Sequence, residues 1–375
     1  MPMSDLPSTD VVVVGAGVVG AAVFHELAAR GVAVTLVDER RGGSGTTAWC
    51  GGVVRCYHDT PELTDRALYG WRYFHAFARH TGFDVRFHTC GFLYWPSAGR
   101  APAARAEAAR IAAAGAPARW LEPDEVTRRF GTLLHDGSAG AVWEPESGYL
   151  EADEVTRAWL RAGRRKGGRL VEGVRVHEPL RRGGAVRGVR TDAGTLLAGT
   201  VVLATGAWTP ELLTSWGLPH DLWNQAIQVD LRHPATPPAG QPAFMDDVHE
   251  INGRPDPDSG GVYVGHPTGR RCTAEPQRVD PAHSRLIERA GGRRWRWLDG
   301  GSGGGGLRAA ECHAPGQGNW VRPLPGAPGV LLATGFNGGG FKMAPWTGAE
   351  VARRITGTDV PRPETSTDAQ HRSVS

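Results

Sequence analysis

The strongest constraint on the fold lies in residues 10–39. A run of four valines is followed by Gly15, Gly17 and Gly20 in the spacing G-x-G-x-x-G, then by a helical stretch, and then by a second apolar strand that ends at Asp38. Strand, helix and strand in this order predict a βαβ unit, whose two strands lie parallel in one sheet. The chain is therefore expected to have an α/β fold.

The glycine motif also predicts a ligand. The first glycine allows a tight turn, the second lets backbone N–H groups approach a pyrophosphate at the helix N-terminus, and the third lets helix and strand pack closely. Asp38, 18 residues after the last glycine, is placed to bind ribose hydroxyls. The motif predicts a dinucleotide site, for FAD or for NAD; the alternative is a glycine-punctuated turn followed by an ordinary surface aspartate.

Periodicity predicts the other elements of the chain. Helices are expected over residues 61–80, 102–114, 152–166 and 282–290 and from near Pro345, and strands over residues 169–180, 186–206 (a hairpin that turns at residues 192–194), 225–233, 260–266 and 329–336. The glycine-rich segment 299–306 is expected to be a flexible connector. The polar ends, residues 1–9 and 362–375, are expected to be flexible tails.

Composition excludes several classes of protein. With 40% hydrophobic and 22% charged residues, the 375-residue chain is typical of a globular protein of two or three units. Its 42 basic and 39 acidic residues are interleaved. The sequence therefore has no basic stripe of the kind that would predict a nucleic-acid partner. The longest early apolar run, Val11–Phe24, is too short to span a membrane, and the acidic N-terminus does not resemble a signal peptide, so we expect a cytoplasmic protein. Five cysteines without a CxxC pair predict neither a metal site nor a disulfide framework.

Two further segments are suited to lie along an extended cofactor. Residues 39–58 are rich in Gly, Ser and Thr and show no periodicity, and the strand that begins at Val201 ends in the small residues ATG before Trp208. Small residues let the backbone approach a ligand closely. A plain surface loop is the alternative for the first segment.

Together these segments resemble a family, the FAD-dependent amine and amino-acid oxidoreductases that include D-amino-acid oxidase, glycine oxidase and monomeric sarcosine oxidase. The resemblance covers nearly the whole chain in order: GAGVVG with Asp38, the Gly/Ser/Thr loop, the helix and strand ending at Val176, ATGAW, and the C-terminal GFNGGGFK. LRAAECHA around Cys312 and ATGFNGGGFK at residues 333–342 are similar to the two C-terminal signatures of the sarcosine and pipecolate oxidase branch.

The resemblance implies a set of site residues. It implies FAD, bound covalently by Cys312 through a thioether to the flavin 8α-methyl group, and a substrate carboxylate held by Lys342 and Arg55. Lys342 also stands out by composition, because only two of the 42 basic residues are lysines. Lys342 is also expected beside the cofactor, and the other residues expected to contact FAD come from the segments above: Gly15, Gly17, Val18, Gly20, Asp38, Glu39, Arg40, Thr46, Thr47, Ala48, Gly51, Gly52, Val53, Val176, Ala204, Thr205, Gly206, Trp208, Gly335, Asn337, Gly338, Gly339 and Phe341.

The sequence departs from that branch at several positions. The branch uses a further lysine beside flavin N5 in the reaction with oxygen, but no lysine lies between Gly206 and Cys312. Arg270 and Arg271 lie in that region, and Arg271 is taken as a third catalytic residue that supplies the positive charge. Gly52 stands where the branch has an arginine over the flavin, and HAPGQGNW after Cys312 does not resemble the usual Tyr-Thr-x-Thr stretch.

Aromatic residues bear on the substrate. Four tryptophans lie near the segments assigned to flavin or substrate: Trp49, Trp223, Trp320 and Trp346. If two of them line the site, their flat apolar walls favour a cyclic imino acid or an aromatic amino acid over glycine or sarcosine. Three histidines are candidate bases: His58, His249 and His266. Hydride transfer from a neutral amine requires none of them.

The expected architecture has two units. A Rossmann-like FAD-binding domain is assembled from residues 10–80, 151–217 and 311–358, and an inserted antiparallel-sheet substrate domain from residues 81–150 and 218–310.

The expected reaction is oxidation of a C–N bond in an amino or cyclic imino acid by hydride transfer to flavin, giving an imine and, with oxygen as acceptor, hydrogen peroxide. Three alternatives stay open: a flavin dehydrogenase with another acceptor, a flavin monooxygenase, and a non-catalytic FAD-bound interaction protein. The expected partners are a small-molecule amine and an electron acceptor, and the expected state is a monomer or small homo-oligomer.

Overall fold

Two eight-stranded sheets and one two-stranded sheet organise the chain. The computed structural model describes residues 7–130, 139–235, 240–298, 302–316, 318 and 320–358. The predicted tails fall largely outside these ranges, because residues 1–6 and 362–375 are not described.

The first sheet is mostly parallel and contains the predicted βαβ unit. Its strands are β1 (Thr9–Val14), β2 (Val34–Asp38), β8 (Arg169–Glu172), β9 (Val176–Arg182), β10 (Ala185–Thr191), β11 (Gly194–Leu203), β17 (Val321–Pro323) and β18 (Val330–Ala333). The order is β17-β18-β11-β1-β2-β8, with β10 and then β9 paired beside β11. Strand β1 lies parallel to both β2 and β11. The loops that follow these three strands therefore leave the sheet at the same edge, where α/β proteins bind ligands.

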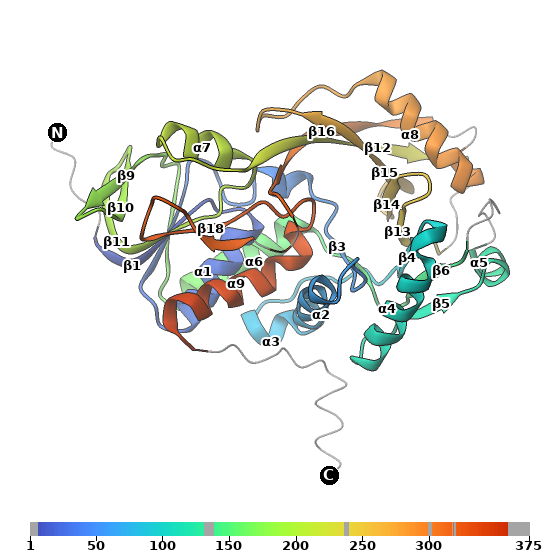
Figure 1. Ribbon diagram of the computed structural model, residues 1–375, viewed down its shortest axis with the longest axis horizontal. Coiled ribbons are helices and arrows are strands. Elements are labelled where there is room, and N and C mark those ends of the chain that lie inside the picture. Colours follow the sequence, from blue (N-terminus) through green and yellow to red (C-terminus); the bar gives the residue numbers. More distant parts are fainter. Residues whose placement is uncertain are drawn as a thin grey trace, which may run out of the picture.

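Three helices pack against one another on this sheet (Figure 1): α1 (Val18–Ala29), α6 (Ala152–Arg165) and α9 (Gly340–Thr356). Helix α1 is apolar around most of its circumference because it is buried between α6 and α9. Glycines permit the close contacts, since a Cβ at Gly163 would lie 2.5 Å from the Phe24 ring and one at Gly348 would lie 2.9 Å from the carbonyl oxygen of Ala22. Neighbouring elements are α2 (Pro61–His75), α3 (Phe77–Thr81), α7 (Thr209–Ser215), η1 (Thr46–Trp49) and η3 (Gly206–Trp208).

The second sheet is mostly antiparallel. Its strands are β4 (Phe92–Trp95), β5 (Arg119–Leu121), β6 (Ala141–Glu144), β12 (Trp223–His233), β13 (Ala243–Asp246), β14 (Ile251–Asp256), β15 (Gly261–Arg271) and β16 (Ser302–His313). The order is β16-β12-β15-β14-β13-β4-β6-β5. Side chains alternate between buried and partly exposed along β12, as expected of a strand with one face against a core.

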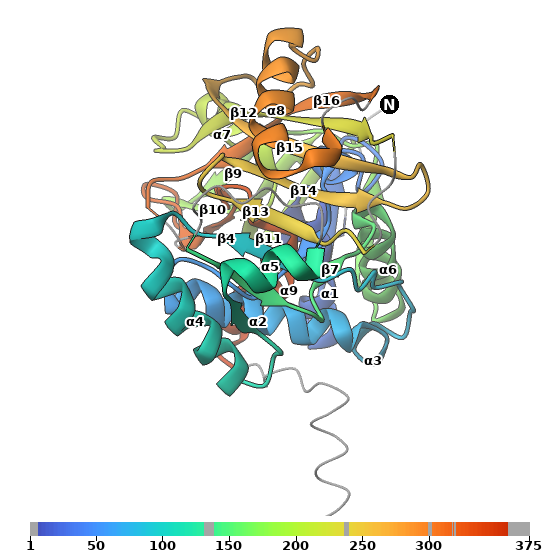
Figure 2. The same cartoon turned by 90° about the vertical axis from the view of Figure 1, so that its right-hand side faces the viewer.

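Helices cover the outer parts of the second sheet, and a short sheet joins its region to the first. Figure 2 shows α8 (Pro281–Arg294) on one side of this sheet and α4 (Ala101–Ala113) on the other. The remaining elements are α5 (Pro123–Phe130), η2 (Ala98–Arg100), η4 (Arg296–Leu298), β3 (Val53–Val54) and β7 (Gly148–Tyr149). Strands β3 and β7 pair antiparallel, which fixes residues 53–54 against the chain that leaves β6.

The structure corrects two predicted helices. The helix expected over residues 61–80 is two helices, α2 and α3, that meet at Ala76. The C-terminal helix begins at Gly340 and not near Pro345. Lys342 therefore lies in the first turn of α9, where the helix backbone fixes its position, and not in the preceding glycine turn.

One strand prediction and one loop prediction are also wrong. The strand expected over residues 169–180 is interrupted, because β8 pairs with β2 whereas β9 pairs with β10. The segment expected to be a flexible connector is largely strand: residues 302–306 begin β16 and pair with β12, while residues 299–301 lie outside the described part. Glycine suits this edge, since a Cβ at Gly304 would lie 2.4 Å from the imidazole of His233.

Gly70 controls the packing of α2 against α9. A Cβ at Gly70 would lie 2.1 Å from the carbonyl oxygen of Lys342. We expect Gly70→Ala to lower the free energy of unfolding by about 1–3 kcal/mol, the usual range for overpacking. Gly99→Ala is the matched control, because no atom of the described residues other than its chain neighbours lies within 4 Å of the added methyl group. Urea denaturation of both variants measures the effect, and equal stabilities would contradict this account of the contact.

Candidate functional site

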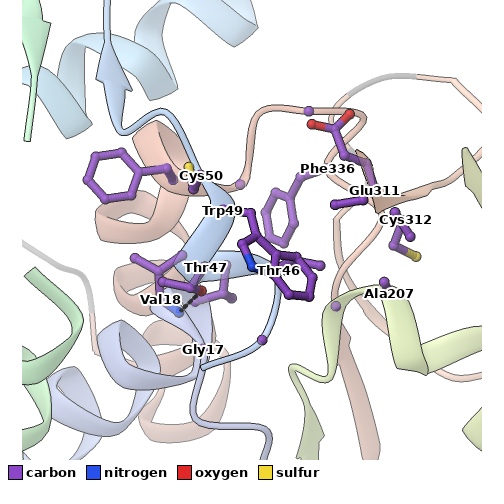
Figure 3. A pocket seen from close by; sticks show the side chains of 18 of the residues that line it. Gly17, Val18, Thr46, Thr47, Trp49, Cys50, Ala207, Glu311, Cys312 and Phe336 are labelled. Carbon is purple, nitrogen blue, oxygen red and sulfur yellow. Dashed lines mark hydrogen bonds between the residues drawn. The ribbon is translucent and has the colours of Figure 1, made fainter. Parts of the chain in front are cut away.

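One large cavity lies where the loops of the first sheet meet the second sheet. Its volume is about 1170 Å³, above the range of about 300–1,000 Å³ usual for small-molecule sites. Figure 3 shows part of its lining, with Thr47 and Cys50 on one side of Phe336 and Cys312 on the other. A cavity of this size suits an extended ligand together with a smaller one.

The glycine motif forms one end of the cavity. Gly15 has a positive φ of 100°, and a Cβ added there would lie 2.6 Å from the carbonyl oxygen of Ala204. A Cβ at Gly20 would lie 1.8 Å from the carbonyl oxygen of Gly15. The turn and the close contact predicted from the motif are therefore both present, and neither position has room for a larger residue.

The same turn leaves a helix N-terminus facing the cavity. Helix α1 begins after Gly17 without a side-chain cap, and Gly17, Val18 and Val19 line the cavity. The Val18 N–H donates to Thr47 Oγ1 at 3.0 Å, a bond drawn in Figure 3 that ties the following loop to the helix. Uncapped N–H groups and the helix dipole make such a terminus a binding place for phosphate.

Asp38 closes this end of the cavity at the end of β2. Its carboxylate accepts hydrogen bonds from the N–H groups of Ala16 at 2.6 Å and Arg40 at 2.8 Å. Burial raises the pKa of Asp38, and these two hydrogen bonds act in the opposite direction. The carboxylate therefore holds both adjoining turns and still lines the cavity. Glycine turn, helix terminus and acid together fit the dinucleotide predicted from the sequence.

Two neighbouring cations line another part of the cavity. Arg55 follows β3 and is buried; its guanidinium donates to the carbonyl oxygen of Tyr57 and lies 3.8 Å from the sulfur of Met245. Burial, together with the charge of Arg55, lowers the pKa of Lys342 to about 7, whereas Cys50 and Glu311 act in the opposite direction. In the described part of the chain, neither cation forms an ion pair with a carboxylate.

Glu144 is a buried carboxylate that was not predicted from the sequence, and it positions Arg55. Glu144, at the end of β6, accepts hydrogen bonds from the N–H groups of Cys56 at 2.8 Å and Tyr57 at 2.6 Å, and from the Ser147 hydroxyl at 2.5 Å. Burial raises the pKa of Glu144, while those hydrogen bonds and the charge of Arg55 lower it. In the sequence, Glu144 stands out only as an acid at the end of an apolar strand. This pattern does not indicate that its partners Tyr57 and Cys56 lie 87 and 88 residues away.

A neutral imidazole lies beside the two cations. Burial lowers the pKa of His58 far below its usual value, and the charges of Arg55 and Lys342 lower it as well. Its Nε2 is buried and has no hydrogen-bond partner among the described residues. His58 therefore offers the cavity a hydrogen-bonding atom without a charge.

Cys312 lies on β16 with its thiol buried. Its side chain packs among apolar residues that include Trp216 and Leu222, and burial raises its pKa to about 11. Asn337 fixes the chain around it, because the Asn337 N–H donates to the Cys312 carbonyl oxygen at 3.4 Å and Asn337 Oδ1 accepts from the Ala314 N–H at 3.0 Å. The two C-terminal segments singled out in the sequence thus meet at the cavity.

The structure brings nearly all the predicted site residues together. Every residue predicted to bind FAD or substrate lines the cavity except Gly20, which packs behind the turn, and Arg271. Arg271 is exposed at the end of β15, 5.3 Å from the ring centroid of Trp223. Of the remaining candidates, the residues in the lining are Trp49, Trp320, His58 and His266, and those outside it are Trp223, Trp346 and His249.

Comparison with known proteins gives the family. Residues 10–354 match the family described as FAD dependent oxidoreductase. The chain belongs to this family. FAD dependence and the oxidoreductase class, both predicted from the sequence, are thereby confirmed.

Individual relatives agree with this assignment. The chain is 29% identical to monomeric sarcosine oxidase of Streptomyces avermitilis over 94% of its own length and 95% of that protein. It is 32% identical to 4-methylaminobutanoate oxidase (formaldehyde-forming) of Paenarthrobacter nicotinovorans, over 55% of this chain but only a quarter, 25%, of that longer protein.

A solved structure confirms the fold. L-proline dehydrogenase from P. horikoshii matches with a TM-score of 0.82 over 98% of this chain and 99% of that chain, at 23% identity. The predicted α/β architecture with a second, antiparallel sheet is therefore confirmed. None of the described helices is long and apolar enough to cross a membrane.

The lowered pKa of Lys342 predicts a pH dependence for carboxylate binding. The ammonium form attracts a carboxylate, and the free site loses this proton above about pH 7. The dissociation constant of acetate, measured from the flavin absorption of the holoprotein, should therefore be constant below pH 7 and rise about tenfold per pH unit above it. Lys342→Met should bind acetate weakly at every pH. A wild-type affinity that stays constant from pH 6 to pH 9 would contradict the role of Lys342.

Proposed function

We propose that this protein oxidises a C–N bond in a carboxylate-bearing amine, with FAD as its cofactor. The observation that carries the proposal is the position of Arg55, which is buried, and Lys342, which is half-buried. Neither has a carboxylate partner among the described residues, and both line the same cavity as the dinucleotide-binding turn. Buried charges are costly unless they are paired. An anionic substrate supplies the missing partner.

The chain's own residues bind and orient this substrate. Arg55 and Lys342 hold its carboxylate, and two contacts to one group fix the direction of the amine-bearing carbon. Phe92 and Met245 line the cavity beside Arg55, and their apolar side chains exclude water. The bound FAD supplies the hydride acceptor. The residues named above set the distance and the angle at which the substrate meets it.

The proposal assigns the rest of the cavity to FAD. The turn from Gly15 to Gly17 and the N-terminus of α1 hold the pyrophosphate, Asp38 holds the ribose, and Cys312 carries the flavin covalently. The predicted division into a cofactor unit and a substrate unit belongs to this proposal, as do a cytoplasmic location and a monomeric or small homo-oligomeric state.

A dehydrogenase that uses another electron acceptor is a second candidate. No lysine lies between residues 206 and 312, and Arg271, predicted to replace that charge, does not line the cavity. The site thus lacks the lysine that the resemblance associates with oxygen use, and the arginine predicted to replace it lies outside the lining. Hydrogen peroxide measured per turnover separates the two candidates.

Reduction of the bound flavin tests the proposed reaction. Without oxygen, a carboxylate-bearing amine should bleach the flavin absorption of the holoprotein. Arg55→Met and Lys342→Met should each lower kcat/KM by about 10²–10³-fold, as expected for loss of one partner of a buried ionic contact. Lys166→Met, which changes the other lysine, on the surface, is the control. A flavin that no amino or imino acid reduces would contradict the proposed reaction and favour a non-catalytic protein.

Acid precipitation tests the covalent bond. Wild-type protein should carry its yellow colour into the precipitate, and Cys312→Ala should release flavin into the supernatant. The buried, weakly acidic thiol packs among apolar side chains, so Cys312→Ala is expected to keep the fold. Free flavin released from the wild type would contradict covalent attachment and leave the other assignments unaffected.

A further inference from the structure

A third cation lines the cavity from the second sheet, and like Arg55 it is buried. Arg254, on β14, has only 7% of its surface exposed. Its guanidinium carbon lies 4.1 Å from the ring centroid of Tyr149 and 5.0 Å from that of Tyr263. Two aromatic rings therefore hold the guanidinium in place without neutralising its charge.

The hydrogen bonds of Arg254 are incomplete. One terminal nitrogen donates to the carbonyl oxygen of Pro255 at 3.1 Å. The other forms a long ion pair with Glu151 at 3.5 Å, and the Glu151 side chain is 46% exposed. The Nε atom is buried and has no partner among the described residues. Arg294, which is also buried, shows the usual arrangement, because its Nε donates to the carboxylate of Asp246 at 2.6 Å.

Arg254 lies across one loop from the other cations. A Cβ at Gly51 would lie 4.0 Å from Arg254 Nε, so the guanidinium reaches the backbone of the loop that Lys342 approaches from α9. Burial dominates the raised pKa of Cys50 in this loop, and the charges of Lys342 and Arg254 both act on its thiol. The loop around Cys50 therefore separates two positively charged parts of the same cavity.

We propose that Arg254 binds a second carboxylate, so that the substrate is an amine with two carboxylate groups. One carboxylate lies between Arg55 and Lys342, and the other pairs with the free side of the Arg254 guanidinium. Glu151 can turn into solvent when this second group binds, since its contact with Arg254 is long and its side chain is exposed. The inference rests on the proposed function for the amine, but the anion contact itself does not depend on any reaction.

Binding of unreactive acids tests the anion contact without turnover. Malonate, succinate and glutarate are compared with propionate, butyrate and valerate, which have the same chain lengths and one carboxylate each. Dissociation constants are measured from the flavin absorption of the holoprotein. At least one diacid should bind about tenfold or more tightly than its monoacid partner, the effect of one added charge-assisted contact.

Three variants assign this difference to Arg254. Arg254→Met keeps a side chain between the two tyrosine rings and should abolish the preference for the diacid while leaving monoacid binding unchanged. Arg254→Lys should restore part of it. Arg164→Met removes an exposed arginine of α6 outside the cavity and should leave every constant unchanged.

Several results would overturn the proposal. Equal affinities of the wild type for diacids and monoacids would do so. An Arg254→Met variant that loses affinity for diacids and monoacids to the same extent would also do so. A change in the flavin spectrum of ligand-free Arg254→Met would place the guanidinium against the cofactor and likewise reject the second carboxylate. Aspartate and 2-aminobutyrate, compared in anaerobic flavin reduction, then test the amine: if neither reduces the flavin while succinate still binds preferentially, the proposed reaction fails and the anion contact stands.

Discussion

Buried positive charge without a buried acid to pair it determines what this cavity can bind. Arg55 and Arg254 are almost fully buried, and Lys342 has its pKa lowered to about 7. Glu144, the acid whose charge acts most strongly on Arg55, already accepts three hydrogen bonds from other groups. In a globular protein such charges are normally paired inside the fold. Here the fold holds them at the wall of a cavity, and an anionic ligand completes their interactions.

The two sheets make this arrangement possible. Parallel strands of the first sheet deliver the glycine turn, Asp38 and the loop after η1 to a single edge. The second sheet closes the cavity from the opposite side, and the pairing of β3 with β7 holds Arg55 between them. The dinucleotide-binding turn and the cations therefore belong to different parts of the chain but to one cavity.

The sequence predicts the parts of the site that are local in the chain. The glycine turn, α1 and Asp38 lie within 39 residues, and their spacing alone determines their geometry. Arg55, Lys342 and Cys312 were identified through resemblance and do line the cavity, although their roles stay predictions.

Glu144 and Arg254 were missed because their partners come from distant strands, and register between strands is not readable from one sequence. Arg271 lies outside the lining for the same reason, since β15 lines the cavity only at Tyr263 and residues 265–267. Likewise, segment 302–306 is strand because β12, about 70 residues earlier, pairs with it.

A crystal structure of the holoprotein with bound acetate tests whether one cavity holds both FAD and a carboxylate. FAD should extend from the glycine turn at Gly15 toward Lys342, with the acetate carboxylate between Arg55 and Lys342. Density for a dinucleotide elsewhere, or a cavity in which acetate avoids both cations, would contradict this expectation.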